Sequence, residues 1–173
     1  MNTTRSSTRA AAAGLLAVLA GALLAPVGAE AAAHVRSCTN ADLTASYRAT
    51  DAGAGHRYGR LILTNTSSSS CRTGGYGGLS YVGDGDGTQI GAAATRDPGK
   101  VRSYVVRPGQ RLVSRVDAVV AANYSVKRCH PAHVDGFRVY VPNATKSQYV
   151  AHATRGCRNA KIHLLSHGPL HRP

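Results

Sequence analysis

Side chains able to carry out acid–base chemistry are few in this sequence of 173 residues. Only eight residues are acidic, and seven of those are Asp. Cleavage of a glycosidic bond needs two carboxyl groups flanking that bond, and Asp84 and Asp86 form the closest pair. Both stand in a glycine-rich turn, where Asp side chains ordinarily bond to the neighbouring backbone. We therefore interpret both as turn residues, and too few oxygen ligands surround them for a calcium site.

Nucleophiles and metal ligands are equally hard to place. Ser80 stands in Gly78-Leu79-Ser80-Tyr81, which does not match the G-x-S-x-G motif of serine hydrolases, so we expect it to be a strand residue. His130 and His133 are three residues apart beside a proline, and we expect them in a loop. The sequence thus predicts a protein that is not an enzyme, with no cofactor and no metal site. An unrecognised hydrolase would need Asp84 or Asp135 beside a partly buried histidine.

Basic charge is the strongest signal in the sequence. Twenty-one Lys and Arg against eight acidic residues give a formal charge of +13. In residues 34–173, fifteen of the nineteen basic residues are Arg, whose planar guanidinium suits forked contacts with phosphate and carboxylate. The matching partners are an anionic cell-wall polymer or an acidic surface. No motif that reads nucleic-acid sequence is present, so nucleic-acid binding would be non-specific and salt-dependent.

A predicted hairpin brings three of the arginines together. Residues 101–106 and 111–120 alternate as strands do, and Pro108-Gly109 marks a turn between them. Pairing across this turn places Arg102 opposite Arg115, and opposed like charges cost stability unless an anion relieves them. The candidate anion-binding residues are Arg102, Arg111 and Arg115. The alternative is a solvated face on which these side chains splay apart.

The first 33 residues are typical of an export signal. Arg5 and Arg9 form a positive segment, residues 10–25 are apolar, and Ala29-Glu30-Ala31 matches a signal-peptidase site. The apolar run is shorter than the roughly 20 residues that a bilayer requires. We therefore predict a signal peptide at residues 1–33, secretion, and no stable membrane insertion after cleavage. A retained anchor is the alternative.

The predicted extracellular location determines how the four cysteines are interpreted. Four cysteines outside the cell predict two disulfides, with three possible pairings. No C-x-x-C motif is present, which disfavours a zinc or redox site. We favour Cys38–Cys71 and Cys129–Cys157, which would each join one end of the domain.

Alternation with a period of two, rather than helical periodicity, dominates residues 34–166. Besides the hairpin, strands are expected at residues 43–50, 58–65, 79–82, 88–92, 137–141, 148–153 and 161–165. This pattern predicts an all-β fold, an antiparallel immunoglobulin-like β-sandwich of about eight strands. Residues 167–173 lack a period and are expected to form a flexible tail.

The order of cysteines and turn residues carries a resemblance to a known family. Its elements are Cys38, Leu63-Thr64-Asn65, Cys71-Arg72-Thr73-Gly74-Gly75-Tyr76, Gly87, Pro108-Gly109, Cys129-His130-Pro131 and Cys157. Over about residues 38–165, the chain resembles domain-of-unknown-function family 4232, whose members are secreted or lipid-anchored actinobacterial proteins. The resemblance implies a β-sandwich and export, and it brings no activity or catalytic residue. Members often have proline where this chain has Gly77, so that corner is expected to be looser.

Together these observations predict a secreted, non-enzymatic interaction or envelope module that is attracted to anionic polymers. The alternative is a secreted protease inhibitor that presents a rigid loop. Its candidate loops are residues 66–72 and 121–129, which each lie beside a cysteine. No recognised inhibitor motif is present in either loop.

Overall fold

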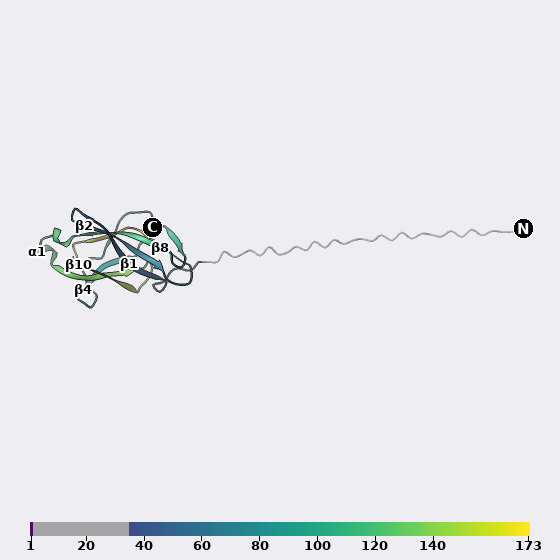
Figure 1. Ribbon diagram of the computed structural model, residues 1–173, viewed down its shortest axis with the longest axis horizontal. Coiled ribbons are helices and arrows are strands. Elements are labelled where there is room, and N and C mark those ends of the chain that lie inside the picture. The colour runs from purple at the N-terminus through teal and green to yellow at the C-terminus, as the bar shows by residue number, and fades with distance from the viewer. Residues whose placement is uncertain (2–34) are drawn as a thin grey trace. The chain divides into compact units, whose positions relative to one another are not determined.

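The computed structural model describes Met1 and residues 35–173 (Figure 1). The chain divides into two units, Met1–Ala33 and His34–Pro173, and only the second is described beyond Met1. The predicted signal peptide therefore falls outside the described residues except for Met1. Within the described part of the chain, no helix combines the length and the apolar character needed to cross a membrane.

The second unit is built almost entirely from strands. Two short helices, η1 (Ala121–Asn123) and α1 (Val126–Cys129), interrupt them between β8 and β9. The strands are β1 (Leu43–Gly53), β2 (His56–Asn65), β3 (Cys71–Gly74), β4 (Gly78–Gly83), β5 (Thr88–Ile90), β6 (Thr95–Arg96), β7 (Ser103–Val106), β8 (Arg111–Val119), β9 (Pro131–Tyr140), β10 (Ser147–Cys157) and β11 (Leu165–His167).

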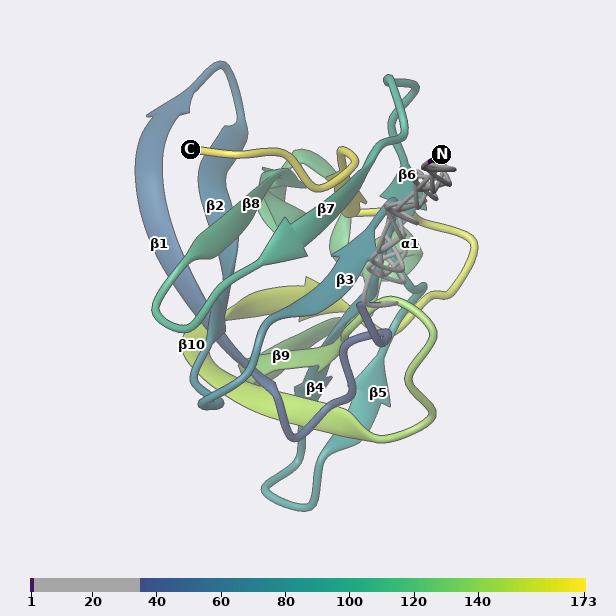
Figure 2. The same ribbon diagram turned by 90° about the vertical axis from the view of Figure 1, so that its right-hand side faces the viewer.

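Hydrogen bonding arranges these strands in three sheets. The five-stranded sheet has the order β1-β2-β8-β11-β6, the four-stranded sheet has the order β10-β9-β4-β5, and β3 pairs with β7 alone. Figure 2 shows β1, β2 and β8 in the upper part of the view and β10, β9, β4 and β5 in the lower part. All strand pairs are antiparallel except β6 and β11, which run parallel.

One hydrophobic core joins the three sheets. Successive strand residues point to opposite faces, and β2 follows this rule by burying Leu61 and Leu63 while Arg60 is exposed. Phe137 of β9 is completely buried in the same cluster. The cluster also takes residues from the other strands, among them Leu79, Val106, Leu112, Val116, Val139 and Leu165.

Both favoured disulfides are present. Cys38 bonds to Cys71, which ties the first described residues to β3. Cys129 bonds to Cys157, which ties the end of α1 to the end of β10. The described residues contain no free cysteine.

Most predicted strands exist, and the errors are local. The strand expected at residues 161–165 is wrong, because Asn159 holds a turn there. Its backbone oxygen accepts from the Ile162 amide at 3.0 Å, and its Oδ1 accepts from the Lys161 amide at 3.0 Å. The strand at that point, β11, begins only at Leu165. The short strands β3 and β6 were not expected.

The predicted pairing of residues 101–106 with residues 111–120 is wrong. The edge of β8 that it required is occupied by the C-terminal segment: β11 pairs with residues 116–118, and His171 forms a bridge with Val113. In that bridge each backbone amide donates to the other residue's carbonyl, at 2.8 and 2.9 Å. Strand β7 pairs with β3 instead. The Pro108-Gly109 turn therefore connects strands of different sheets.

The same contacts revise the expectation of a flexible tail from residue 167. Leu170 is only 2% exposed, and its amide donates to the Gly75 carbonyl at 2.8 Å. Figure 2 shows this segment, in yellow, crossing the fold beside β8 and β7. The tail lacks strand periodicity because a single apolar residue, rather than an alternating series, anchors it.

Candidate anion-binding face

The structure separates the three arginines that the sequence grouped. Arg111 and Arg115 are exposed on β8, on the face opposite the buried Leu112 and Val116. Arg102 precedes β7 and lines a different hollow, together with Arg72 of β3. Of the three predicted residues, only Arg111 and Arg115 therefore lie on the same face of the sheet.

A different set of arginines lies in line across the five-stranded sheet. Arg48 of β1 is directly opposite Arg60 of β2, and Arg60 is directly opposite Arg115 of β8. All three side chains are exposed. Neighbouring strands lie roughly 5 Å apart, so three cationic side chains cross the sheet side by side. We call Arg48, Arg60 and Arg115 the arginine row.

Two shallow hollows adjoin this row. Arg48, Arg60 and Arg111 line a hollow of about 350 Å³ that Pro173 borders. Arg60 and Arg115 line a second hollow of about 500 Å³, which His171 borders. The packed C-terminal segment thus supplies part of the wall of both hollows.

Charge in the arginine row is not neutralised by described carboxylates. The ion pairs among residues 35–173 are Arg36–Asp42, His56–Asp117, His133–Asp135 and Arg158–Asp84, and none includes the row. The Arg115 guanidinium carbon lies 5.4 Å from the centre of the Tyr58 ring, a cation–π arrangement. Repulsion between the directly opposed cations is therefore left for solvent or a bound anion to relieve.

The acidic residues of the β4–β5 turn are occupied in the fold. The Asp84 carboxylate accepts two hydrogen bonds from Arg158, at 2.6 and 2.9 Å, which lower the Asp84 pKa. Asp86 accepts from the Thr88 amide at 2.9 Å, as expected of a turn residue. Asp135 accepts from the Gly85 amide at 2.9 Å, and its histidine neighbour His133 is mostly exposed. No group of three or more potential metal ligands occurs among the described residues.

The serines sit in structural positions. Ser80 is a buried residue of β4, as predicted. Ser114 Oγ lies 3.2 Å from His167 Nδ1 and donates to the Gly168 carbonyl at 2.6 Å. Ser114 and His167 are 1% and 2% exposed, so this Ser–His contact fastens β8 to the C-terminal segment where no substrate reaches it.

Both loops put forward for protease inhibition are held by local contacts. Residues 121–129 contain η1 and α1 and end at the Cys129 disulfide. The loop after Asn65 is fixed by that side chain, whose Nδ2 donates to the Ser69 and Val106 carbonyls at 2.9 and 2.8 Å. Asn65 Oδ1 also accepts from the Ser67 amide at 3.0 Å.

Comparison with protein families gives a match over residues 38–170 to DUF4232, a domain of unknown function. The chain belongs to this family. No curated protein and no solved structure matches it. The match extends past β11 to Leu170, which agrees with a C-terminal segment that is part of the DUF4232 fold. Asn65, which ends the Leu63-Thr64-Asn65 motif, is completely buried, so that motif has a structural role here.

Gly77, where the resemblance implies a frequent proline, lies close to another part of the backbone. A Cβ atom at Gly77 would clash with the Tyr140 carbonyl oxygen unless the backbone shifted. The β3–β4 connection therefore packs directly against the backbone at the end of β9.

Proposed function

We propose that this DUF4232 domain is a secreted, non-enzymatic binding module of the actinobacterial cell envelope that holds anionic polymers. The observation that carries the proposal is the arginine row, three cations in register on an exposed sheet face and without an acidic partner among the described residues. A polymer that carries phosphate, sulfate or carboxylate groups relieves their mutual repulsion and gains forked hydrogen bonds.

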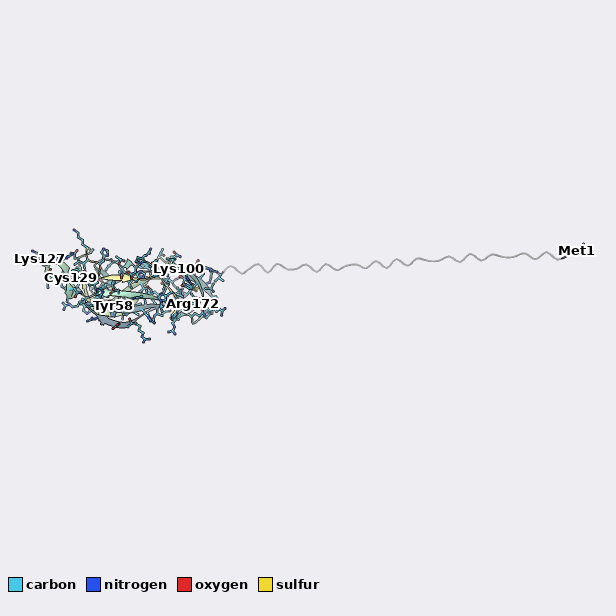
Figure 3. The ribbon with its side chains drawn as sticks, turned by 90° about the horizontal axis from the view of Figure 1, so that it is seen from above. Met1, Tyr58, Lys100, Lys127, Cys129 and Arg172 are labelled. Carbon is cyan, nitrogen blue, oxygen red and sulfur yellow. A yellow bond between two sulfur atoms is a disulfide. The ribbon has the colours of Figure 1, made fainter. Side chains whose placement is uncertain are left out.

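Charge over the rest of the domain supports attraction at longer range. Residues 34–173 carry nineteen basic and seven acidic residues, and such an excess raises the encounter rate with polyanions. Basic residues are spread along the domain: Figure 3 labels Lys127 near one end and Lys100 and Arg172 toward the other. A long polymer therefore meets more cations than a single anion does.

The architecture and compartment belong to the same proposal. We infer an immunoglobulin-like sandwich in which the five-stranded and four-stranded sheets enclose the common core. Two disulfides favour an oxidising, extracellular location, because cytosolic thiols are kept reduced. A domain stabilised by two disulfides keeps its strands, and so the aligned arginines on them, in place outside the cell.

Chromatography on heparin and on immobilised polyphosphate tests the proposal. The row variant is Arg48→Gln, Arg60→Gln and Arg115→Gln together. Its matched control, Arg102→Gln with Arg107→Gln and Arg128→Gln, removes the same charge from exposed sites elsewhere. We expect the unchanged protein to elute above physiological ionic strength of about 0.15 M, and the row variant to elute at clearly lower salt than the control.

Salt dependence separates a built site from general attraction. Each lost phosphate contact lowers the slope of log affinity against log salt by about one, so we expect the row variant to lose up to about three and the control less. Elution of the unchanged protein at or below physiological salt rejects polyanion binding. Equal behaviour of the two triple variants rejects the arginine row as the site.

A further inference from the structure

A further hollow is distinct from the two beside the arginine row, although it shares Ala49 with one of them and Asp51 and Tyr58 with the other. It has a volume of about 440 Å³, and its lining comes from β1, β2 and β8 of one sheet and from β4 and β10 of the other. The edge strands β1 and β10 contact each other.

A side chain of β10 joins the edges of the two larger sheets near this hollow. Gln148 of β10 accepts from the Ala45 amide of β1 at 2.8 Å and donates to Asn40 Oδ1 at 3.0 Å. Farther along, β1 has a bulge between Ala49 and Asp51, and β10 has one between Ala151 and Thr154. Bulges bend strands and redirect side chains, and they are frequent beside binding sites. We call this hollow the bulge cleft.

Aromatic rings line the inner part of the bulge cleft. Tyr47, Tyr81 and His152 line it, and all three pack on Phe137, with ring centres 4.8, 5.3 and 4.9 Å from that ring. The His152 ring is nearly parallel to Phe137, at 6°. The opposite wall is aliphatic and consists of Ala118, Val119, Val120, Ala121 and Ala122.

Two tyrosines, Tyr47 and Tyr81, line this space, and Tyr81 is only 4% exposed. Neither the Tyr47 nor the Tyr81 hydroxyl hydrogen-bonds to another described residue, and no unpartnered side-chain atom among these residues is sealed from solvent. Burial raises the pKa of both phenols, and their proximity raises that of Tyr81 further. Burial also lowers the His152 pKa. Both phenols therefore remain neutral hydrogen-bond donors at neutral pH.

The charged residues that line the bulge cleft favour an anionic ligand. Arg57 of β2 and Arg155 of β10 line the cleft from opposite sheets and are exposed, against the single carboxylate of Asp51. The only hydrogen bond of the Arg57 guanidinium to a described residue goes to the adjacent His56 carbonyl, at 3.2 Å. Neither arginine belongs to a described ion pair. The rim thus offers two cationic groups beside an apolar interior.

We propose that the bulge cleft binds a small amphipathic anion, with an aromatic or short alkyl group on the Phe137-backed rings and a carboxylate between Arg57 and Arg155. The cleft volume is in the range of small-molecule sites, roughly 300–1,000 Å³. Gln148 joins β10 to β1 at Ala45, two residues before the cleft-lining Tyr47. This site is distinct from the arginine row, since none of the three row arginines lines it, although Asp51 and Tyr58 border both the bulge cleft and the hollow beside Arg60 and Arg115.

The probe is 4-phenylbutyrate, with the neutral alcohol 4-phenylbutanol as its matched control, measured by calorimetry and by amide chemical shifts of the protein. We expect 4-phenylbutyrate to shift amides at residues 118–122 and 151–155 and to bind at least about tenfold more tightly than the alcohol, since hydrogen bonds to a charged group contribute at least that factor. Equal affinity for the acid and the alcohol would reject the role of Arg57 and Arg155 in binding a carboxylate. The absence of shifts at these amides would reject the bulge cleft as a binding site.

Substitutions in and outside the bulge cleft test which residues contribute to binding of the two probes. Arg57→Gln with Arg155→Gln should weaken 4-phenylbutyrate about tenfold or more and leave the alcohol unchanged. Arg48→Gln with Arg60→Gln removes the same charge from the outer face, at positions that do not line the cleft, and should leave 4-phenylbutyrate affinity unchanged while lowering heparin retention. Ala122→Leu, at an exposed position of η1, should block both probes without changing the melting temperature. A greater loss from the outer-face pair than from the rim pair refutes the cleft while leaving the arginine row intact.

Discussion

Phe137 is the residue around which the aromatic side chains gather. It is the single Phe of a chain without Trp, it is fully buried, and the rings of Tyr47, Tyr81 and His152 all contact it. A chain so poor in large apolar rings has few ways to refill the space that this ring occupies. Packing on Phe137 therefore fixes both the core and the interior of the bulge cleft.

Phe137→Ala should lower the free energy of unfolding by about 3–5 kcal/mol, because it removes a buried ring and leaves a cavity. Guanidinium unfolding followed by circular dichroism measures the loss. Tyr149→Ala is the control, since Tyr149 is 60% exposed, and it should change stability by less than about 1 kcal/mol. Similar losses in the two variants would show that Phe137 does not organise the core.

His167 should make stability depend on pH near neutrality. It is 2% exposed, and its pKa is lowered chiefly by desolvation, with Arg96 adding to the effect while Asp97 and the Gly168 carbonyl oppose it. The unfolded chain then takes up a proton first, near the ordinary value of about 6.5. Stability is therefore full above that pH and falls as the pH drops below it.

Unfolding free energies between pH 7.5 and pH 5 test this dependence. Asp42, whose pKa is lowered mainly by its hydrogen bonds with Arg36, loses its contribution only below about pH 4, so it does not interfere in this window. His167→Gln should flatten the curve, and His152→Gln should flatten it less, because burial lowers the His152 pKa as well but that ring is less buried. An unchanged slope in His167→Gln would contradict this assignment.

Among the structural elements, those defined by local signals could be predicted and those defined by distant partners could not. Alternation located β2 and β8, and cysteine spacing favoured the correct disulfides. The predicted hairpin failed because its turn is real but β11, some fifty residues later, occupies the edge of β8. The arginine row was missed for the same reason: the register of β1, β2 and β8 aligns Arg48, Arg60 and Arg115 from segments that no local pattern connects.

The packed C-terminal segment should contribute to the stability of the fold through Leu170. Leu170→Ala should lower the free energy of unfolding by about 2–5 kcal/mol, the range for truncating a buried Leu, because Leu170 is 2% exposed and anchors the segment beside β8. Lys100→Ala, at an exposed position, should be nearly neutral. Thermal and guanidinium unfolding measure both variants. A neutral Leu170→Ala would restore the flexible tail that the sequence suggested.

Across the whole domain, the disulfides and the excess positive charge have opposite effects on folding stability. The disulfides close loops with sequence separations of 33 and 28 residues, and loops of that size contribute about 3–4 kcal/mol each in the chain-entropy description. Nineteen basic residues in residues 34–173 face seven acidic ones, and such an excess destabilises a compact state through self-repulsion. The links therefore help the domain to tolerate a charge that would otherwise oppose folding.

Salt should consequently stabilise this protein. Screening lengths shorten from about 30 Å at 0.01 M to about 10 Å at 0.1 M ionic strength, so the melting temperature should rise over that range in sodium chloride. At equal ionic strength, phosphate should raise it further than chloride in the unchanged protein, because we propose that the arginine row binds phosphate. Phosphate also stabilises proteins by exclusion from their surface, so the row variant should keep the rise in chloride and show a smaller additional rise in phosphate than the matched control. A melting temperature that falls with added chloride would mean that attractive ion pairs outweigh the repulsion, and the charge argument would then fail for the folded domain.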